Sequence, residues 1–212
     1  MPPTLLRSPV AIAADVALVL AADSSGSVSD QDIDLQFQGY AEAITNGTFL
    51  NAVRSGRHGR IALAFFAWSS DDDQELLVPW ILIDGISTAR RFATTLLQAP
   101  WPVPGYTSIS SAIDYAGRLL AACEFPSDRW VIDISGDGFN NDGRAVTEAR
   151  DEAISAGITI NGLPVVRGER TIADYYSENV VGGPGAFVLV AHDIASFRTA
   201  VLRKLLTEIA LR

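Results

Sequence analysis

The stretch Val16–Asp30, VALVLAADSSGSVSD, joins an apolar run to a group of small polar residues. The run over residues 16–22 is aliphatic, partly β-branched and uncharged, which is typical of a strand buried on both faces. Asp23 and a set of hydroxyls follow where this run ends. Ser29 and Asp32 then form the capping-box pattern that marks the start of a helix. The stretch therefore predicts a strand, a polar loop and a helix in succession.

Apolar runs and helical patterns keep alternating along the rest of the chain. Further strands are predicted over residues 60–68, 76–83, 130–135, 158–165 and 186–190. Helices are predicted over residues 29–45, 87–98, 108–123, 144–156, 171–179 and 194–211. The acidic loop SSDDDQE is too short for a helix, so the second and third strands should form a hairpin, and Pro79 favours an edge position. We therefore predict a doubly wound α/β fold with a mostly parallel sheet, one antiparallel edge strand and helices on both faces.

Length and composition favour a single domain. The chain has 212 residues, of which 48% are hydrophobic, and it contains no linker-like or repetitive segment. We expect one domain over residues 15–212, preceded by a tail or trimmed signal remnant over residues 1–14. The small residues at 11–14 resemble a signal cleavage site and favour an exported or periplasmic protein. The apolar stretch before them is short and broken by Pro9, so an ordinary chain start is the alternative.

The net charge of −9 argues against two classes of partner. A nucleic-acid-binding protein needs a basic face, and so does a protein that binds anionic lipid. No run of about twenty apolar residues is present, so we expect no membrane-spanning helix. The single cysteine, Cys123, excludes a disulfide within the chain and a Cys/His metal cluster, and its helical spacing from apolar residues predicts a buried position.

Three loops carry oxygen donors: ADSSGS after the first strand, PGYTS before a long helix, and SGDGFNND after the strand at 130–135. In parallel sheets, ligands bind at loops beyond the carboxyl ends of the strands, so the three loops can share one edge. Together they offer two carboxylates and three hydroxyls, from Asp23, Ser25, Ser27, Thr107 and Asp137. Oxygen donors without nitrogen or sulfur suit a hard cation such as Mg²⁺, and Mn²⁺ or Ca²⁺ would accept the same donors.

The three segments together resemble the von Willebrand factor type A family. DSSGS matches its Asp-x-Ser-x-Ser motif, GYTSISSAIDYA is similar to its threonine segment, and WVIDISGDG is similar to its Asp-Gly segment. In that family these segments define the metal-ion-dependent adhesion site (MIDAS). The similarity extends over essentially the whole chain, and it is greatest to a bacterial branch of the family that has no established activity.

The resemblance implies a role for each of the five residues. Ser25 and Ser27 would bind the metal through their hydroxyls, and Thr107 would bind it directly or through water. Asp23 and Asp137 would hold the coordinating waters and balance the charge. An Asp or Glu carboxylate from a protein partner would complete the octahedron, which implies a cation-dependent binding or adhesion module without catalysis. The tail FNND departs from the usual third segment and leaves the surroundings of the open position undefined.

Other interpretations stay open at this point. Hydroxyls and carboxylates of this kind are also common in helix caps and turns. A serine hydrolase would need Ser, His and Asp together, but no Gly-x-Ser-x-Gly elbow surrounds Ser25, and Asp193 beside His192 is explained as a helix cap. An accessory subunit of a AAA+ ATPase or chelatase assembly is a further alternative, as some intracellular relatives of the family are.

Two features beside the candidate loops have ordinary explanations. The acidic loop SSDDDQE lacks the spacing of a calcium loop, so a solvated hairpin turn is expected. The aromatic residues Trp101, Tyr106 and Phe139 flank the candidate loops, where they could form a binding rim, although packing is the default expectation.

Overall fold

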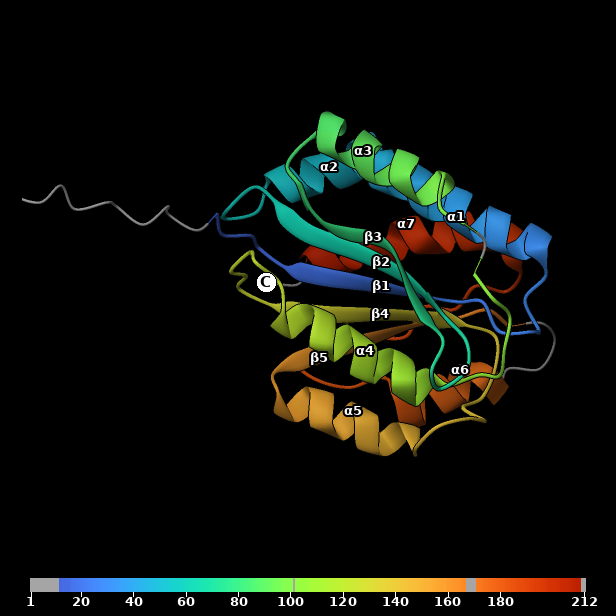
Figure 1. The fold of residues 1–212 in the computed structure, drawn as a ribbon. Helices are drawn as coiled ribbons and strands as arrows, with labels where there is room; N and C mark the ends of the chain where they lie inside the picture. The colour runs from blue at the N-terminus through green and yellow to red at the C-terminus, as the bar shows by residue number, and fades with distance from the viewer. Residues whose placement is uncertain (1–11, 101, 167–170, 211–212) are drawn as a thin grey trace, which may run out of the picture.

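A single sheet runs through the middle of the chain in the computed structural model, which describes residues 12–100, 102–166 and 171–210 (Figure 1). The strand order is β3-β2-β1-β4-β5. The strands are β1 (Ala17–Asp23), β2 (Ile61–Trp68), β3 (Gln74–Ile83), β4 (Trp130–Gly136) and β5 (Ile158–Pro164). All neighbouring strands are parallel except β3, which pairs antiparallel with β2 at one edge. The predicted α/β fold with one antiparallel edge strand is confirmed.

Helices cover both faces of the sheet (Figure 1). On one face lie α1 (Asp30–Thr45), α2 (Gly47–Arg54), α3 (Ile86–Leu97) and α7 (Ile194–Ala210). On the other lie α4 (Ile109–Ala121), α5 (Val146–Ser155), α6 (Thr171–Tyr175) and the π-helical turn η1 (Tyr176–Val180). Helices on both sides of a parallel sheet bury both faces of its strands, which explains why the strand sequences are continuously apolar.

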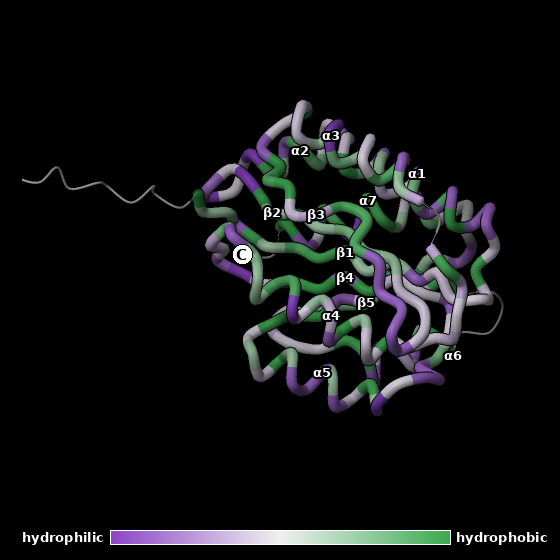
Figure 2. Tube along the Cα trace, viewed as in Figure 1, coloured by the Kyte–Doolittle hydropathy of each residue, from purple (hydrophilic) through white to green (hydrophobic). Residues whose placement is uncertain are grey.

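The central strand β1 divides its side chains between two hydrophobic cores. Leu18 and Leu20 face the core under α1, α2, α3 and α7. Ala17, Val19 and Ala21 face the core under α4 and α5, because successive side chains of a strand point to opposite faces. Figure 2 shows the strands as a largely green band between helices that carry purple segments.

Helix α1 begins and packs as its sequence predicts. Ser29 Oγ accepts the backbone N–H of Asp32, and the Asp32 carboxylate accepts the N–H of Ser29, which completes the capping box. The rings of Phe37 and Tyr40 pack edge-on against Phe65 of β2, with centroids 5.6 and 5.1 Å apart. The helix is thereby fixed over the sheet immediately after the polar loop that follows β1.

Helix α2 was not predicted from the sequence. Asn46-Gly47 ends α1, but Asn46 also caps the next helix, because its Oδ1 accepts the N–H of Thr48 at 2.8 Å. The buried face of α2 comprises only Phe49, Leu50 and Val53, a short pattern that the preceding helix end obscured.

The predicted strand at 186–190 is wrong as a regular strand. The segment runs beside β5 and pairs with it through isolated bridges only. Gly162 N–H donates to the Phe187 carbonyl at 3.1 Å, and Leu189 N–H donates back to the Gly162 carbonyl at 3.0 Å. Pro164 has no N–H to continue this pattern, so the ladder is interrupted there.

A buried polar network fastens α7 to the sheet. Lys204 Nζ forms an ion pair with Asp133 of β4 and lies 2.8 Å from Glu208 Oε1. Asn161 of β5 donates to the same Glu208 oxygen at 3.1 Å. One ammonium group thus faces two carboxyl groups in the protein interior. Burial raises the pKa of Asp133 to about 7, and the positive charge of Lys204 opposes this rise.

The structure also bears on the predicted N-terminal tail, on Cys123 and on membrane-spanning helices. Of the predicted tail, residues 1–11 lie outside the described residues, and Ala14 is buried and pairs with Ser127. Cys123 is half-buried beyond the end of α4 instead of lying in the core. Within the described ranges, no helix is long and apolar enough to cross a membrane.

Candidate metal centre

The three predicted loops meet at the carboxyl edge of the sheet. β1 and β4 are adjacent and parallel, so the loops that follow Asp23 and Gly136 start side by side. Gly26 N–H donates to the Gly105 carbonyl at 2.9 Å and joins the first loop to the second. The structure therefore brings together segments that are separated by many residues in the chain.

Four of the five predicted residues are linked by direct contacts. Ser27 Oγ donates to Asp137 Oδ1 at 2.6 Å, and the hydroxyls of Ser25 and Ser27 lie 3.2 Å apart. One carboxylate oxygen of Asp23 accepts the N–H of Ser25 at 2.7 Å, and the other accepts the N–H of Asp137 at 3.3 Å. Two carboxylates and two hydroxyls thus form one cluster, in which Asp23, Ser25 and Ser27 are alternate residues of one loop.

Thr107, the fifth residue, lies against the third loop. A Cβ atom on Gly138 would stand 3.2 Å from Thr107 Oγ1, so the absence of a side chain there permits the approach. Asn141 makes two hydrogen bonds with the backbone of Thr107. Thr107 N–H donates to Asn141 Oδ1 at 2.9 Å, and Asn141 N–H donates to the Thr107 carbonyl at 2.9 Å.

The Asp23 carboxylate is buried without a cationic neighbour in the cluster. It is 2% exposed, and burial raises its pKa to about 7, although hydrogen bonds from Ser25 act in the opposite direction. Asp137, the other charged group that acts on it, is also acidic. A buried carboxylate of this kind is costly unless a positive charge accompanies it. A divalent cation would provide that charge.

A buried hydroxyl behind Asp23 points to the same conclusion. A Cβ atom on Gly136 would lie 2.7 Å from both Asp23 Oδ2 and Tyr176 Oη, so the two oxygens flank this glycine. Tyr176 is buried, and its Oη has no hydrogen-bond partner among the described residues. Buried polar atoms are normally satisfied by protein or water, so an ordered water between these groups would fit this site. The donor set and the polar atoms around it are compatible with a hydrated divalent cation.

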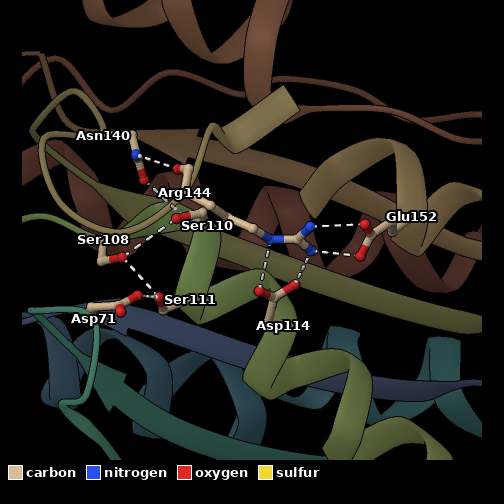
Figure 3. A network of polar contacts seen from close by, with 8 residues as sticks. All are labelled: Asp71, Ser108, Ser110, Ser111, Asp114, Asn140, Arg144 and Glu152. Carbon is tan, nitrogen blue, oxygen red and sulfur yellow. Dashed lines mark hydrogen bonds and ion pairs between the residues drawn. The ribbon is translucent and has the colours of Figure 1, made fainter. Parts of the chain in front are cut away.

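A network of hydrogen bonds and ion pairs around Asn140 and Arg144 supports the third loop (Figure 3). This network was not predicted from the sequence. Asn140 accepts the N–H of Ser110 and donates to the carbonyl of Arg144, at 2.9 and 3.1 Å. The guanidinium of Arg144 is held by the carboxylates of Asp114 on α4 and Glu152 on α5. The unusual tail FNND therefore anchors the third loop to two helices. In the sequence, the departure of FNND from the family pattern was the one indication of this anchoring.

The loop between β2 and β3 is a second support. The predicted hairpin is confirmed, but the loop is more than a solvated turn. Ser69 Oγ donates to the Val103 carbonyl at 3.1 Å, and Ser70 Oγ accepts the N–H of Tyr106 at 2.9 Å. Asp71 contacts Ser111 of α4 (Figure 3). The two serine contacts join the β2–β3 loop to the segment that leads to Thr107.

The structure bears on the alternative interpretations. The N-caps of α1 and α4 are Ser29 and Ser108. The candidate hydroxyls of Ser25, Ser27 and Thr107 therefore do not take the capping positions of these helices. Ser24 Oγ donates to the Trp68 carbonyl at 3.1 Å, which keeps this hydroxyl out of the cluster.

The hydrolase alternative gains no support from the described residues. Asp193 Oδ1 accepts the N–H of Ser196 at 2.6 Å and acts as the predicted cap of α7. His58 pairs with Asp128. Within the described ranges, neither histidine hydrogen-bonds to Ser25 or Ser27, and no group of three or more His, Cys, Asp or Glu side chains is placed to hold a metal ion. The candidate centre consists mainly of hydroxyls.

A family model described as "Protein of unknown function (DUF1194)" matches residues 13–212. Comparison with curated protein sequences gives no match. Among solved structures, proximal thread matrix protein 1 from the mussel byssus, with a zinc-occupied MIDAS motif, has a TM-score of 0.71 and 14% identity. That similarity covers 94% of this chain and 49% of the byssus protein, so the chain spans about half the length of that relative.

Two bacterial structures have the same fold. A von Willebrand factor type A structure from Catenulispora acidiphila has a TM-score of 0.63 and 14% identity, over 93% of this chain and 43% of that one. The vWF domain of the type V pili tip protein Mfa5 from Porphyromonas gingivalis has a TM-score of 0.64 and 9% identity, over 94% and 96%. Identities this low establish the fold alone. The chain has the von Willebrand factor type A fold that the resemblance predicted.

Proposed function

Because the chain belongs to the family described as Protein of unknown function (DUF1194), and because it has the von Willebrand factor type A fold, we propose that it is a divalent-cation-dependent protein-binding or adhesion module. The cation is Mg²⁺, and Mn²⁺ or Ca²⁺ can replace it because the donors are oxygen atoms. The partner is a protein that presents an Asp or Glu carboxylate. The module binds and does not catalyse.

Each of the five residues has a task in this proposal. Ser25, Ser27 and Thr107 offer hydroxyl oxygens to the cation. Asp23 and Asp137 balance its charge and accept hydrogen bonds from the waters around it. The bound cation supplies a positive centre that attracts a carboxylate from outside. Because only two of the five residues are carboxylates, their negative charge does not exceed the positive charge of a divalent cation, which can therefore still attract a partner carboxylate.

The observation that carries the proposal is the contact between Ser27 and Asp137. These residues are 110 positions apart in sequence, yet their side-chain oxygens lie 2.6 Å from each other. A plain turn after β1 and a plain turn after β4 would have no reason to share a hydrogen bond. The contact instead supports a single oxygen-lined centre built from separate loops.

Thermal unfolding with and without Mg²⁺ tests the proposal. At saturating Mg²⁺, about one hundred times its Kd, the wild type should gain about 2.7 kcal/mol, or roughly 5–10 °C in Tm. Ser27→Ala should lose most of this gain because it removes an oxygen donor. Ser24→Ala is the matched control, since this neighbouring hydroxyl bonds to Trp68 and should leave the Mg²⁺ effect intact.

The partner interaction is tested in the same terms. A protein captured by the wild type in Mg²⁺ should be released by EDTA, and it should not be captured by Ser27→Ala. Capture that is equally strong in excess EDTA would contradict the proposal. So would an Mg²⁺ effect that is the same for Ser27→Ala and Ser24→Ala.

A further inference from the structure

Three exposed apolar side chains surround the candidate metal centre. Val103, Tyr106 and Phe139 are 68%, 70% and 47% exposed, and we refer to them as the apolar rim. Tyr106 immediately precedes Thr107, and Phe139 follows Gly138, where an added Cβ atom would stand 3.2 Å from Thr107 Oγ1. Packing was the default expectation for these aromatic residues, and the exposure of Tyr106 shows that it does not apply to that ring. Trp101, the third aromatic residue that flanks the candidate loops in the sequence, lies outside the described residues.

Backbone contacts of Val103 and Tyr106 and a ring contact of Phe139 hold the apolar rim in place. Val103 is tied to Ser69 through its carbonyl, and Tyr106 is tied to Ser70 through its N–H. The Phe139 ring packs edge-on against Tyr175, with centroids 4.9 Å apart. Exposed aromatic groups on a fixed backbone lose little conformational freedom when a partner covers them, which is typical of residues that dominate binding.

The loops around the apolar rim carry negative charge and no positive charge. The segments 23–30, 69–73, 102–108 and 136–143 contain two, three, no and two acidic residues, and no Lys or Arg occurs in any of them. These four segments would therefore repel an acidic partner segment except at a bound cation. Basic side chains of a partner would be attracted by the surrounding carboxylates.

We propose that the partner segment is a loop with one carboxylate flanked by aromatic or aliphatic side chains, together with at least one Lys or Arg. The carboxylate reaches the cation, the apolar flanks cover Val103, Tyr106 and Phe139, and the basic residue faces the acidic loops. This inference rests on the proposed function, because within these four segments a bound cation would be the one positively charged group available to a partner carboxylate.

A library of disulfide-closed peptide loops displayed on phage provides the probe. Each loop has a fixed central Asp and random flanking residues. The full-length chain is immobilised in Mg²⁺, and bound phage are eluted with EDTA. We expect the eluted loops to be enriched in aromatic or aliphatic flanks and in Lys or Arg.

Rim variants then test the contact directly. A selected loop should bind Tyr106→Ser and Phe139→Ser on the order of tenfold more weakly than the wild type. Ile12→Ser is the matched control, because Ile12 is an exposed apolar residue (51%) outside these loops, and it should change binding less than about twofold. The Mg²⁺-induced shift in Tm should be preserved in all three variants, which shows that they are folded and hold the cation.

The failures of the two proposals are distinguishable. EDTA-eluted loops with unselected or polar flanks, or rim variants that bind like the wild type, would overturn the inference and leave the metal-dependent function standing. An absence of EDTA-eluted loops, together with no Mg²⁺ effect on the wild type, would overturn the proposed function and this inference with it.

Discussion

The carboxylate of Asp23 is almost fully buried, with 2% of the residue exposed. Its position at the end of β1 follows from the apolar run before it, and its two oxygens accept N–H groups from Ser25 and Asp137. These bonds do not offset the loss of hydration, because burial still raises the pKa to about 7. The ionised residue therefore costs folding stability, and under the proposed function a bound cation would offset this cost.

Replacing Asp23 with Asn should separate stability from metal binding. Above pH 7 and without metal, the stability of the variant should lie within about 1 kcal/mol of the wild type, because removal of the buried charge is offset by the loss of one of the two acceptor oxygens that the carboxylate offers. The same variant should lose the stabilisation by Mg²⁺. Urea unfolding at pH 8 with and without Mg²⁺ measures both quantities.

Asp15→Asn is the control for Asp23→Asn. Asp15 also accepts backbone N–H groups, from His58 and Arg60, but it precedes β1 and lies outside the candidate centre. This variant should keep the full Mg²⁺ effect. A Mg²⁺ effect that persists in Asp23→Asn would refute the role assigned to Asp23.

At the scale of elements, the attachment of α7 to the sheet should depend on pH. Asp133 faces Lys204 and Glu208 from α7, and its pKa rises from the usual 3.8 to about 7. Between about pH 4 and 7, the folded protein therefore keeps a proton on Asp133 that the unfolded chain has released. Because of this difference, the contribution of Asp133 lowers the stability of the wild type as the pH rises over this range. Asn cannot titrate. The stability of Asp133→Asn relative to the wild type should therefore increase over this range, on the order of 2 kcal/mol.

Urea unfolding of both proteins across this pH range provides the measurement. Asp133→Asn leaves Lys204 paired with Glu208 alone, which balances the buried charges and favours a folded variant. Stability curves that run parallel from pH 4 to 7 would show that Asp133 does not titrate as described.

The elements with clear apolar periodicity were predictable, and the exceptions have local causes. The strand before Asp23, the hairpin and the capping box of α1 follow from side-chain patterns within a few residues. Helix α2 was hidden because Asn46 serves both as the end of one helix and as the cap of the next. The segment 186–190 has the composition of a strand, but regular pairing depends on an N–H that Pro164 of the neighbouring strand lacks.

At the scale of the whole molecule, the order of strands places the candidate centre. Parallel strands put the loops after β1 and β4 at one edge, which made the meeting of Asp23 and Asp137 predictable from their positions alone. The supports were not predictable in this way. Asn141 binds the backbone of Thr107, and Ser70 binds the backbone of Tyr106, 34 and 36 residues away. Contacts with distant backbone atoms leave no pattern in a single sequence.

The central claim is that these loops form one divalent-cation site. A crystal structure of the full chain grown with Mn²⁺, with anomalous scattering recorded, tests it most directly. The account predicts one anomalous peak among Asp23, Ser25, Ser27, Thr107 and Asp137, bonded to the serine hydroxyls and absent from Ser27→Ala crystals. A Mn²⁺-saturated crystal with no peak among these residues, or with its strongest peak elsewhere, would contradict the account.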